Sequence, residues 1–224
     1  MSRKVIFAPE EFYHIYNRGT EKRKVFLLKA DYERFLALLY LCNNKETLHA
    51  SDYQGSTLSE KLSLERSETI VNIDAYCLMP NHFHLLMQEK VENGISNFMQ
   101  KLTTGYTMYF NKRNDRTGAL FQGRFKATHA KDDRYLKYLV SYIHLNPVKI
   151  IDSEWKENGI KDKNKASQFL KNYTYSSYLD FCGKKRIEER IINKNSLPEY
   201  FNSINNFENT TKFWLDNPIV KVQP

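Results

Sequence analysis

One stretch decides the fold of this chain: Ala75-Tyr-Cys-Leu-Met-Pro-Asn-His-Phe-His-Leu-Leu-Met-Gln88. It belongs to a longer apolar run that begins at Ile70, stops at the Pro80-Asn81 pair and resumes at once with His82. Two apolar runs joined by a tight Pro-Asn turn are typical of an antiparallel β-hairpin. The other predicted elements are placed around this hairpin.

His82 and His84 lie in the second arm of the hairpin with one apolar residue between them. Successive side chains of a strand point to opposite faces, so both imidazoles are expected on the same face of the sheet. A pair of imidazoles is half of a metal site. The pair alone is weak evidence, because most chance occurrences of this spacing are ordinary buried or solvated histidines.

The segments on either side of the hairpin alternate between strand and helix patterns. The predicted elements are a strand over 11–18, a helix from Asp31, the hairpin, a helix over 95–110, a strand over 119–128, and a helix from Asp132 to about Asn146. This order is that of a split β-α-β unit of the ferredoxin-like kind with one appended helix. We therefore predict an α+β fold whose antiparallel sheet carries the histidine pair on a central strand and whose appended helix carries Tyr142.

Domain organisation follows from the same pattern. Residues 8–150 form the predicted domain, with a polar surface insertion at about 43–68. Residues 151–224 are more polar, and we expect them to be a C-terminal extension that docks on the core. The aromatic residues expected to mediate this docking are Trp155, Tyr175, Tyr178 and Trp214.

The composition limits the classes of function. With 34 Lys and Arg against 26 Asp and Glu, the formal net charge is +8, which favours a polyanionic partner. The three cysteines are widely spaced and include no CxxC pair, so neither a disulfide framework nor a thiolate zinc site is indicated. No apolar segment approaches the roughly 18 residues of a membrane-spanning helix. We expect a protein of the reducing cytoplasm, without a membrane partner and acting as a monomer or homodimer.

Tyr142 and Asn146 supply the second half of the predicted chemistry. Attack of a hydroxyl on a phosphodiester gains from a divalent cation, and Mg²⁺ or Mn²⁺ would need an oxygen ligand beside the two imidazoles. Asn146 can offer its amide oxygen, and it lies one helical turn from Tyr142 on the same face. On the residue pattern alone, Tyr138 is an equal candidate for the attacking hydroxyl.

These motifs resemble the single-tyrosine HUH transposases, most closely the REP-associated tyrosine transposases. The resembling stretches occur in the same order within residues 8–150: Tyr13-His-Ile-Tyr-Asn-Arg-Gly19, Asp31-Tyr-Glu-Arg-Phe-Leu36, Ala75 to Leu85, Phe121-Gln-Gly-Arg-Phe125 and Tyr142-Ile-His-Leu-Asn-Pro-Val-Lys149. So long an ordered set is more specific than any single motif.

The resemblance implies roles for four residues. His82 and His84 would be ligands of Mg²⁺ or Mn²⁺, Asn146 the third ligand, and Tyr142, rather than Tyr138, the nucleophile. The implied substrate is single-stranded DNA, often with a small hairpin or palindromic repeat near the cut. The implied reaction passes through a 5′-phosphotyrosine intermediate and leaves a free 3′-hydroxyl. The classical transposon branch has Gln where this chain has Asn146.

Several polar and basic side chains are candidate DNA contacts. They are Gln122, Arg124 and Lys126 on the polar side of the 119–128 alternation, Arg18 in the first strand, and Lys112 and Arg113 at the end of the second helix. Each has an ordinary alternative as a solvated strand face or a favourable helix end. The pattern assigns no role to His14, His49 or His129, and His144 should point away from Tyr142.

We therefore expect a metal-dependent single-stranded DNA endonuclease and strand transferase of the transposase kind. One alternative is a domesticated or inactive protein of the same fold that binds hairpin DNA. A third possibility is an RNA-binding module, since a ferredoxin-like sheet can also present aromatic residues to bases. The segment around Arg124 lacks the aromatic spacing of that RNA-binding signature.

Overall fold

The computed structural model describes residues 5–46, 52–53, 55–201 and 203–216. Its centre is a four-stranded antiparallel sheet in the order β2-β3-β1-β4. The strands are β1 (Phe12–Arg18), β2 (Val71–Met79), β3 (His82–Glu89) and β4 (Lys126–His129). The predicted α+β class and antiparallel sheet are confirmed, and the hairpin turn falls at Pro80 and Asn81.

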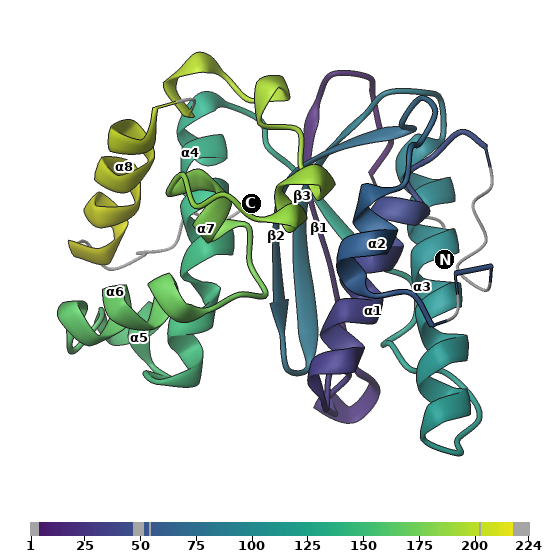
Figure 1. Cartoon of the computed structure of the whole chain (residues 1–224). Helices are drawn as coiled ribbons and strands as arrows, with labels where there is room; N and C mark the ends of the chain where they lie inside the picture. Colours follow the sequence, from purple (N-terminus) through teal and green to yellow (C-terminus); the bar gives the residue numbers. More distant parts are fainter. Residues whose placement is uncertain (1–4, 47–51, 54, 202, 217–224) are drawn as a thin grey trace.

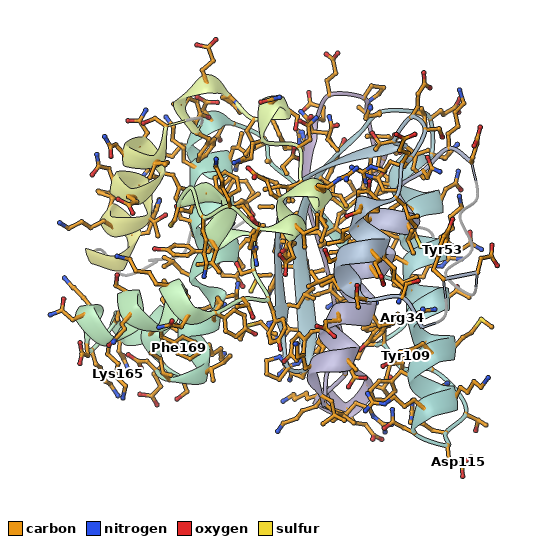
Figure 2. The ribbon with its side chains drawn as sticks, viewed as in Figure 1. Arg34, Tyr53, Tyr109, Asp115, Lys165 and Phe169 are labelled. Carbon is orange, nitrogen blue, oxygen red and sulfur yellow. The ribbon has the colours of Figure 1, made fainter. Side chains whose placement is uncertain are left out.

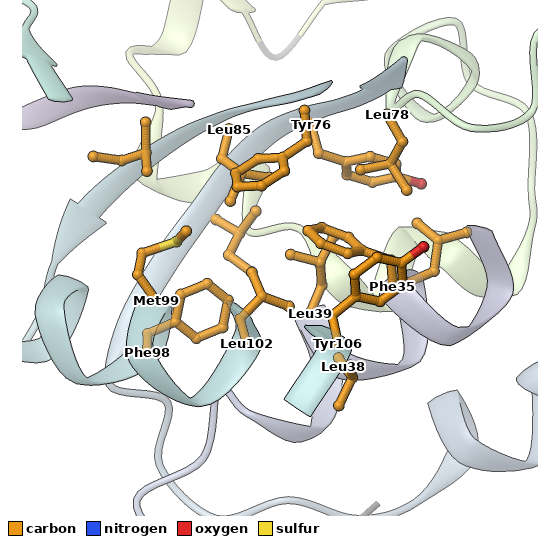
Figure 3. Close-up of a cluster of buried hydrophobic side chains, with 14 of the residues drawn as sticks. Phe35, Leu38, Leu39, Tyr76, Leu78, Leu85, Phe98, Met99, Leu102 and Tyr106 are labelled. Atoms are coloured by element: carbon orange, nitrogen blue, oxygen red, sulfur yellow. The ribbon is translucent and has the colours of Figure 1, made fainter. Parts of the chain in front are cut away.

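Two helices cover one face of the sheet, α1 (Lys29–Leu41) and α3 (Gly94–Arg113) (Figure 1). Between these helices and the sheet lies a first hydrophobic core, which Figure 3 shows in close-up. Residues that alternate along the strands face helix residues spaced by three or four. Members of this core include Ile15, Tyr76, Leu78, Phe83, Leu85, Phe35, Leu39, Phe98, Leu102 and Tyr106.

The opposite face is covered by α4 (Asp133–Leu145) and by helices from the C-terminal part of the chain (Figure 1). A second core joins Leu86 and Cys77 of the sheet to Leu136, Leu139 and Ile143 of α4. Figure 2 labels Lys165 and Phe169 on this side of the molecule, away from Arg34 and Tyr109 on the side of the first core. The sheet is thus packed on both faces.

The C-terminal residues add short helices around α4. They are α5 (Trp155–Asn158), α6 (Lys163–Asn172), α7 (Tyr178–Phe181) and α8 (Ile204–Asp216), with 3₁₀ turns η2 (Asn146–Ile150), η3 (Ile187–Ile191), η4 (Lys194–Ser196) and η5 (Glu199–Phe201). Trp155 and Tyr178 are buried in the second core, Tyr175 stacks on Tyr32, and Trp214 meets Tyr138 edge to face.

Residues 175–177 cover the outer edge of β2. The Leu78 amide donates to the Tyr175 carbonyl (2.9 Å), and the Ser177 amide donates to the Tyr76 carbonyl (3.0 Å). An uncovered edge strand exposes unpaired backbone groups that promote aggregation. Arg186 secures the segment by pairing with the buried Asp180 and donating to the Tyr76 hydroxyl (3.0 Å).

One expectation about local structure needs correction. The strand predicted over 119–128 is restricted to Lys126–His129, because Gly123 adopts a positive φ of 69° that breaks the extended backbone. Phe121 makes only an isolated bridge, to Gly19. The polar insertion at 43–68 contains a short helix, α2 (Leu58–Ser63), capped by Thr57, while residues 47–51 and 54 lie outside the described part. A further 3₁₀ turn, η1 (Thr20–Lys22), follows β1.

Candidate active site

The strand register brings the polar side chains of the sheet together on the face beneath α4. His82 pairs with Arg18, and His84 pairs with Tyr16, which in turn pairs with Lys126. Directly opposed residues of antiparallel strands project to the same face. The two histidines, Arg18 and Lys126 therefore share this face of the sheet, and β3 lies between β2 and β1.

His84 is held by a third histidine that the sequence pattern did not select. A hydrogen bond of 2.8 Å joins His84 Nδ1 to His14 Nε2, and both side chains are buried. With Nδ1 engaged in this way, His84 Nε2 is buried and has no hydrogen-bond partner among the described residues. The alternation of His14, Tyr16 and Arg18 along β1 was the available signal, since these side chains all project to the polar face.

His82 is oriented by its neighbour. A hydrogen bond of 2.6 Å joins His82 Nδ1 to Asn81 Oδ1, and Asn81 Nδ2 donates to the Lys22 carbonyl (3.1 Å). An amide oxygen only accepts, so the proton of His82 lies on Nδ1 and the lone pair lies on Nε2. A second contact that fixes the tautomer in this way is the usual accompaniment of a metal-ligating histidine.

The three imidazoles are neutral at physiological pH. Burial lowers the pKa of His14 to about 3 and that of His82 to about 4, and it holds the pKa of His84 well below its ordinary value. After burial, the positive charges of Arg18, Lys156 and Lys149 lower the pKa of His82 further. Only a neutral imidazole can ligate a metal, and the surrounding cations favour a phosphate anion.

Tyr142 projects from α4 toward these histidines. Its ring meets His84 and His14 edge to face, with centroid separations of 5.5 and 5.8 Å, and stacks on Tyr138 at 5.7 Å. Burial raises the pKa of Tyr142, whereas a hydrogen bond from Asn146 lowers it. Lys156 Nζ lies 4.2 Å from the ring centroid and donates to the hydroxyl oxygen at 2.7 Å. Tyr138 has no contact with either histidine of the pair among the ring contacts of the described residues.

Asn146 lies where α4 passes into the 3₁₀ turn η2. Despite Pro147, its backbone stays helical (φ −53°, ψ −37°), so it keeps the face of Tyr142. Its Nδ2 donates to the Tyr142 carbonyl (3.0 Å), and its side chain also contacts His82, whose pKa it raises. Asn146 is 1% exposed, and its Oδ1 is buried without a partner in the described structure.

These atoms fit a small divalent cation. Among the described residues, the buried atoms His84 Nε2 and Asn146 Oδ1 lack hydrogen-bond partners. His82, whose Nε2 carries a lone pair when the proton lies on Nδ1, contacts the Asn146 side chain. Buried polar atoms are rarely left unsatisfied, so such a group needs an explanation, and the binding of an ion is one. Within the described residues, no group of three or more His, Cys, Asp or Glu is suited to a metal. A bound Mg²⁺ or Mn²⁺ would therefore keep water or substrate oxygens as further ligands.

The predicted DNA contacts fall into two groups. Arg18 and Lys126 project to the face of the histidines, and Gln122 and Arg124 are exposed beside the Gly123 bend, where the Gln122 amide donates to the Arg18 carbonyl (2.8 Å). Lys112 and Arg113 lie instead at the end of α3, across the sheet from the histidines. Arg113 pairs there with the buried Asp31.

The remaining histidines have other partners. His144 points away from Tyr142, as expected, and bonds to the Ser177 hydroxyl (2.8 Å) within the second core. His129 pairs with Glu11 (2.6 Å) at the surface. His49 lies outside the described residues.

Comparison with known proteins bears on this arrangement. The family model described as "Transposase IS200 like" matches residues 12–146, which is more than half of the chain. The chain belongs to the IS200-like transposase family. The matched range contains His82, His84, Tyr142 and, as its last residue, Asn146.

A solved structure supports the fold of this transposase family member. It is a REP-associated tyrosine transposase bound to a REP hairpin, with a TM-score of 0.52 and 12% sequence identity. The match covers 84% of this chain and 90% of that one. Comparison with curated proteins finds no match. The family resemblance seen in the sequence is thus confirmed. In the described parts of this transposase family member, no helix is long and apolar enough to span a membrane.

Proposed function

We propose that this protein is a metal-dependent single-stranded DNA endonuclease and strand transferase that uses Tyr142 as its nucleophile. One observation carries the proposal. The nucleophile candidate, two neutral histidines and an amide oxygen without a hydrogen-bond partner among the described residues converge on one face of the sheet, although they come from two elements about 60 residues apart. In the proposed domain organisation, residues 8–150 form the catalytic unit and residues 151–224 dock on it.

Each of these residues has a separate proposed role. His82 Nε2, His84 Nε2 and Asn146 Oδ1 would hold Mg²⁺ or Mn²⁺, which would neutralise charge on the scissile phosphate and align the leaving group. The Tyr142 oxygen forms a bond to phosphorus as the bond from phosphorus to the 3′ oxygen breaks. The phenol loses its proton and the leaving 3′ oxygen gains one. The product is a 5′-phosphotyrosine, which conserves the phosphodiester for rejoining.

We propose single-stranded DNA with a hairpin or palindromic repeat as the substrate. The net charge of +8 and the cations around His82 favour a nucleic acid, and the solved structure of similar fold is bound to a REP hairpin. Arg18, Lys126, Gln122 and Arg124 surround the histidine face and are the proposed contacts to the strand. Lys112 and Arg113 would reach only DNA that wraps to the α3 side. The setting we propose is the cytoplasm, with the protein as a monomer or homodimer.

The test is adduct formation. Incubation with hairpin-containing single-stranded DNA and Mn²⁺ should give a protein–DNA adduct that survives denaturation and disappears in Tyr142→Phe. Tyr138→Phe is the matched control, because it removes a neighbouring hydroxyl from the same helix and should leave the adduct. An adduct that persists in Tyr142→Phe refutes the assignment of the nucleophile. Binding without any adduct, in all metals tried, would favour the domesticated hairpin-binding protein.

A further inference from the structure

Lys156 reaches Tyr142 from outside the part of the chain that the family model matches. It lies on α5, ten residues beyond Asn146, where the match ends. Its Nζ donates to the Tyr142 hydroxyl oxygen at 2.7 Å and lies 4.2 Å from the centre of the ring. The ammonium therefore contacts the atom that must reach phosphorus in the proposed reaction.

The position of Lys156 is fixed by its neighbour. Trp155 is 1% exposed in the second core, and its amide bonds to the Asp152 carbonyl at the start of α5. The side chain of Lys156 is consequently directed back over α4 and not into solvent. Most lysines are fully solvated and hold no single rotamer, so this placement has to be maintained against side-chain entropy.

The surroundings of Lys156 give no ordinary structural reason for its charge. Among the described residues, no carboxylate forms an ion pair with its Nζ. Burial lowers its pKa to about 8. A partly buried ammonium without an ion-pair partner weakens a fold, so its placement on the Tyr142 oxygen favours a role in chemistry or binding.

The ring contacts of Tyr142 constrain the plane of the ring but not the hydroxyl oxygen. The stack on Tyr138 and the edge contacts with His14 and His84 fix the plane of the ring. The hydroxyl oxygen accepts a hydrogen bond from Lys156 Nζ at 2.7 Å, and the Asn146 side chain also bonds to the phenol. An attacking oxygen that is displaced by about 1 Å can lose roughly a hundredfold in rate, so this contact bears directly on reactivity.

We propose that Lys156 is a positioning residue that holds the Tyr142 oxygen for attack, so that the C-terminal extension completes the active site. The inference rests on the proposed function. During the step, the ammonium stays beside an oxygen that gives up a proton and gains a bond to phosphorus. It takes no part in the bond changes itself.

The experiment measures adduct formation in a single turnover with saturating hairpin DNA and Mn²⁺, in the full chain. Lys156→Met keeps the aliphatic stem and removes the donor, and Lys156→Arg restores a cationic donor. We expect Lys156→Met to lower the rate about 10- to 100-fold, with DNA affinity and Tm near those of wild type. Lys156→Arg should recover part of this loss. Lys161→Met, which removes an exposed charge from the same extension, should stay within about twofold of wild type.

Three results would overturn the inference. In the first, Lys156→Met reacts at the wild-type rate at saturating DNA. In the second, Lys156→Met binds the hairpin more weakly and its lower rate reflects incomplete saturation, because the lysine is a DNA contact. In the third, Lys156→Met and Lys156→Arg both lose Tm together with rate, because the lysine is needed for folding. The proposed function fails separately, when the wild-type chain itself forms no Tyr142-dependent adduct. A normal wild-type adduct with an unaffected Lys156→Met variant leaves the proposed function intact and removes only the role of the lysine.

Discussion

His14→Phe is the substitution that tests the arrangement of the histidines most directly. Phenylalanine keeps a ring where His14 packs between Tyr16 and His84, at centroid distances of 4.9 and 5.0 Å. It removes both ring nitrogens, one of which, Nε2, bonds to His84 Nδ1 at 2.8 Å. The substitution therefore removes the hydrogen bond that orients His84 and keeps an aromatic ring in the same place.

The expected effect has two parts. Removal of a residue that orients a metal-ligating histidine typically lowers metal affinity about 10- to 100-fold, or roughly 1.4 to 2.7 kcal/mol. His84 Nδ1 also becomes an unpaired buried polar atom, which should cost about 1 to 3 kcal/mol of folding stability. Titration calorimetry with Mn²⁺ measures the first quantity, and urea unfolding without metal measures the second.

A matched control separates these effects from the general loss of an imidazole. His129→Phe removes a surface histidine that pairs with Glu11, outside the site, and should change Mn²⁺ affinity less than twofold. The reasoning is refuted if His14→Phe binds Mn²⁺ as tightly as wild type while remaining folded. That result would mean that His84 is oriented by the strand alone.

Two further predictions concern stability. Arg186→Met leaves the buried Asp180 carboxylate without its partner and should destabilise the chain by roughly 3 to 5 kcal/mol in urea unfolding. Adding Asp180→Leu should restore most of this stability. A double variant as unstable as Arg186→Met alone would contradict the buried-pair explanation. Burial lowers the pKa of His144 to about 3, below its unfolded value near 6.5, so the unfolded chain binds the proton first and stability should fall as pH drops from 6.5 toward 3. At pH 5 the share of His144 is about 2 kcal/mol, so His144→Gln should lessen the fall in unfolding free energy between pH 7 and pH 5 by about that amount in urea unfolding. An unchanged fall would show that His144 is not buried in its neutral form.

The local elements were largely predictable because each has a short-range cause. The Pro80-Asn81 turn sets the hairpin register, and the two-residue period of a strand places His82 and His84 on the same face. The helical spacing of Tyr142 and Asn146 is equally local. It survives Pro147 because the chain continues as a 3₁₀ turn and does not leave the helical region. The strand over 119–128 was overestimated because alternation of apolar residues cannot reveal that Gly123 turns the backbone.

The sequence by itself determined the elements, the family and the four residues His82, His84, Tyr142 and Asn146. Only the tertiary structure decided what surrounds them. His14 reaches His84 across 70 residues through strand pairing, and Lys156 reaches Tyr142 from a short helix whose position depends on Trp155 in the second core. Neither partner lies at a helical or strand spacing from the residue it contacts, so no periodic pattern could connect them. Such contacts depend on how the helices pack against the sheet. This packing is determined by the burial of many side chains in the two cores and not by any single motif.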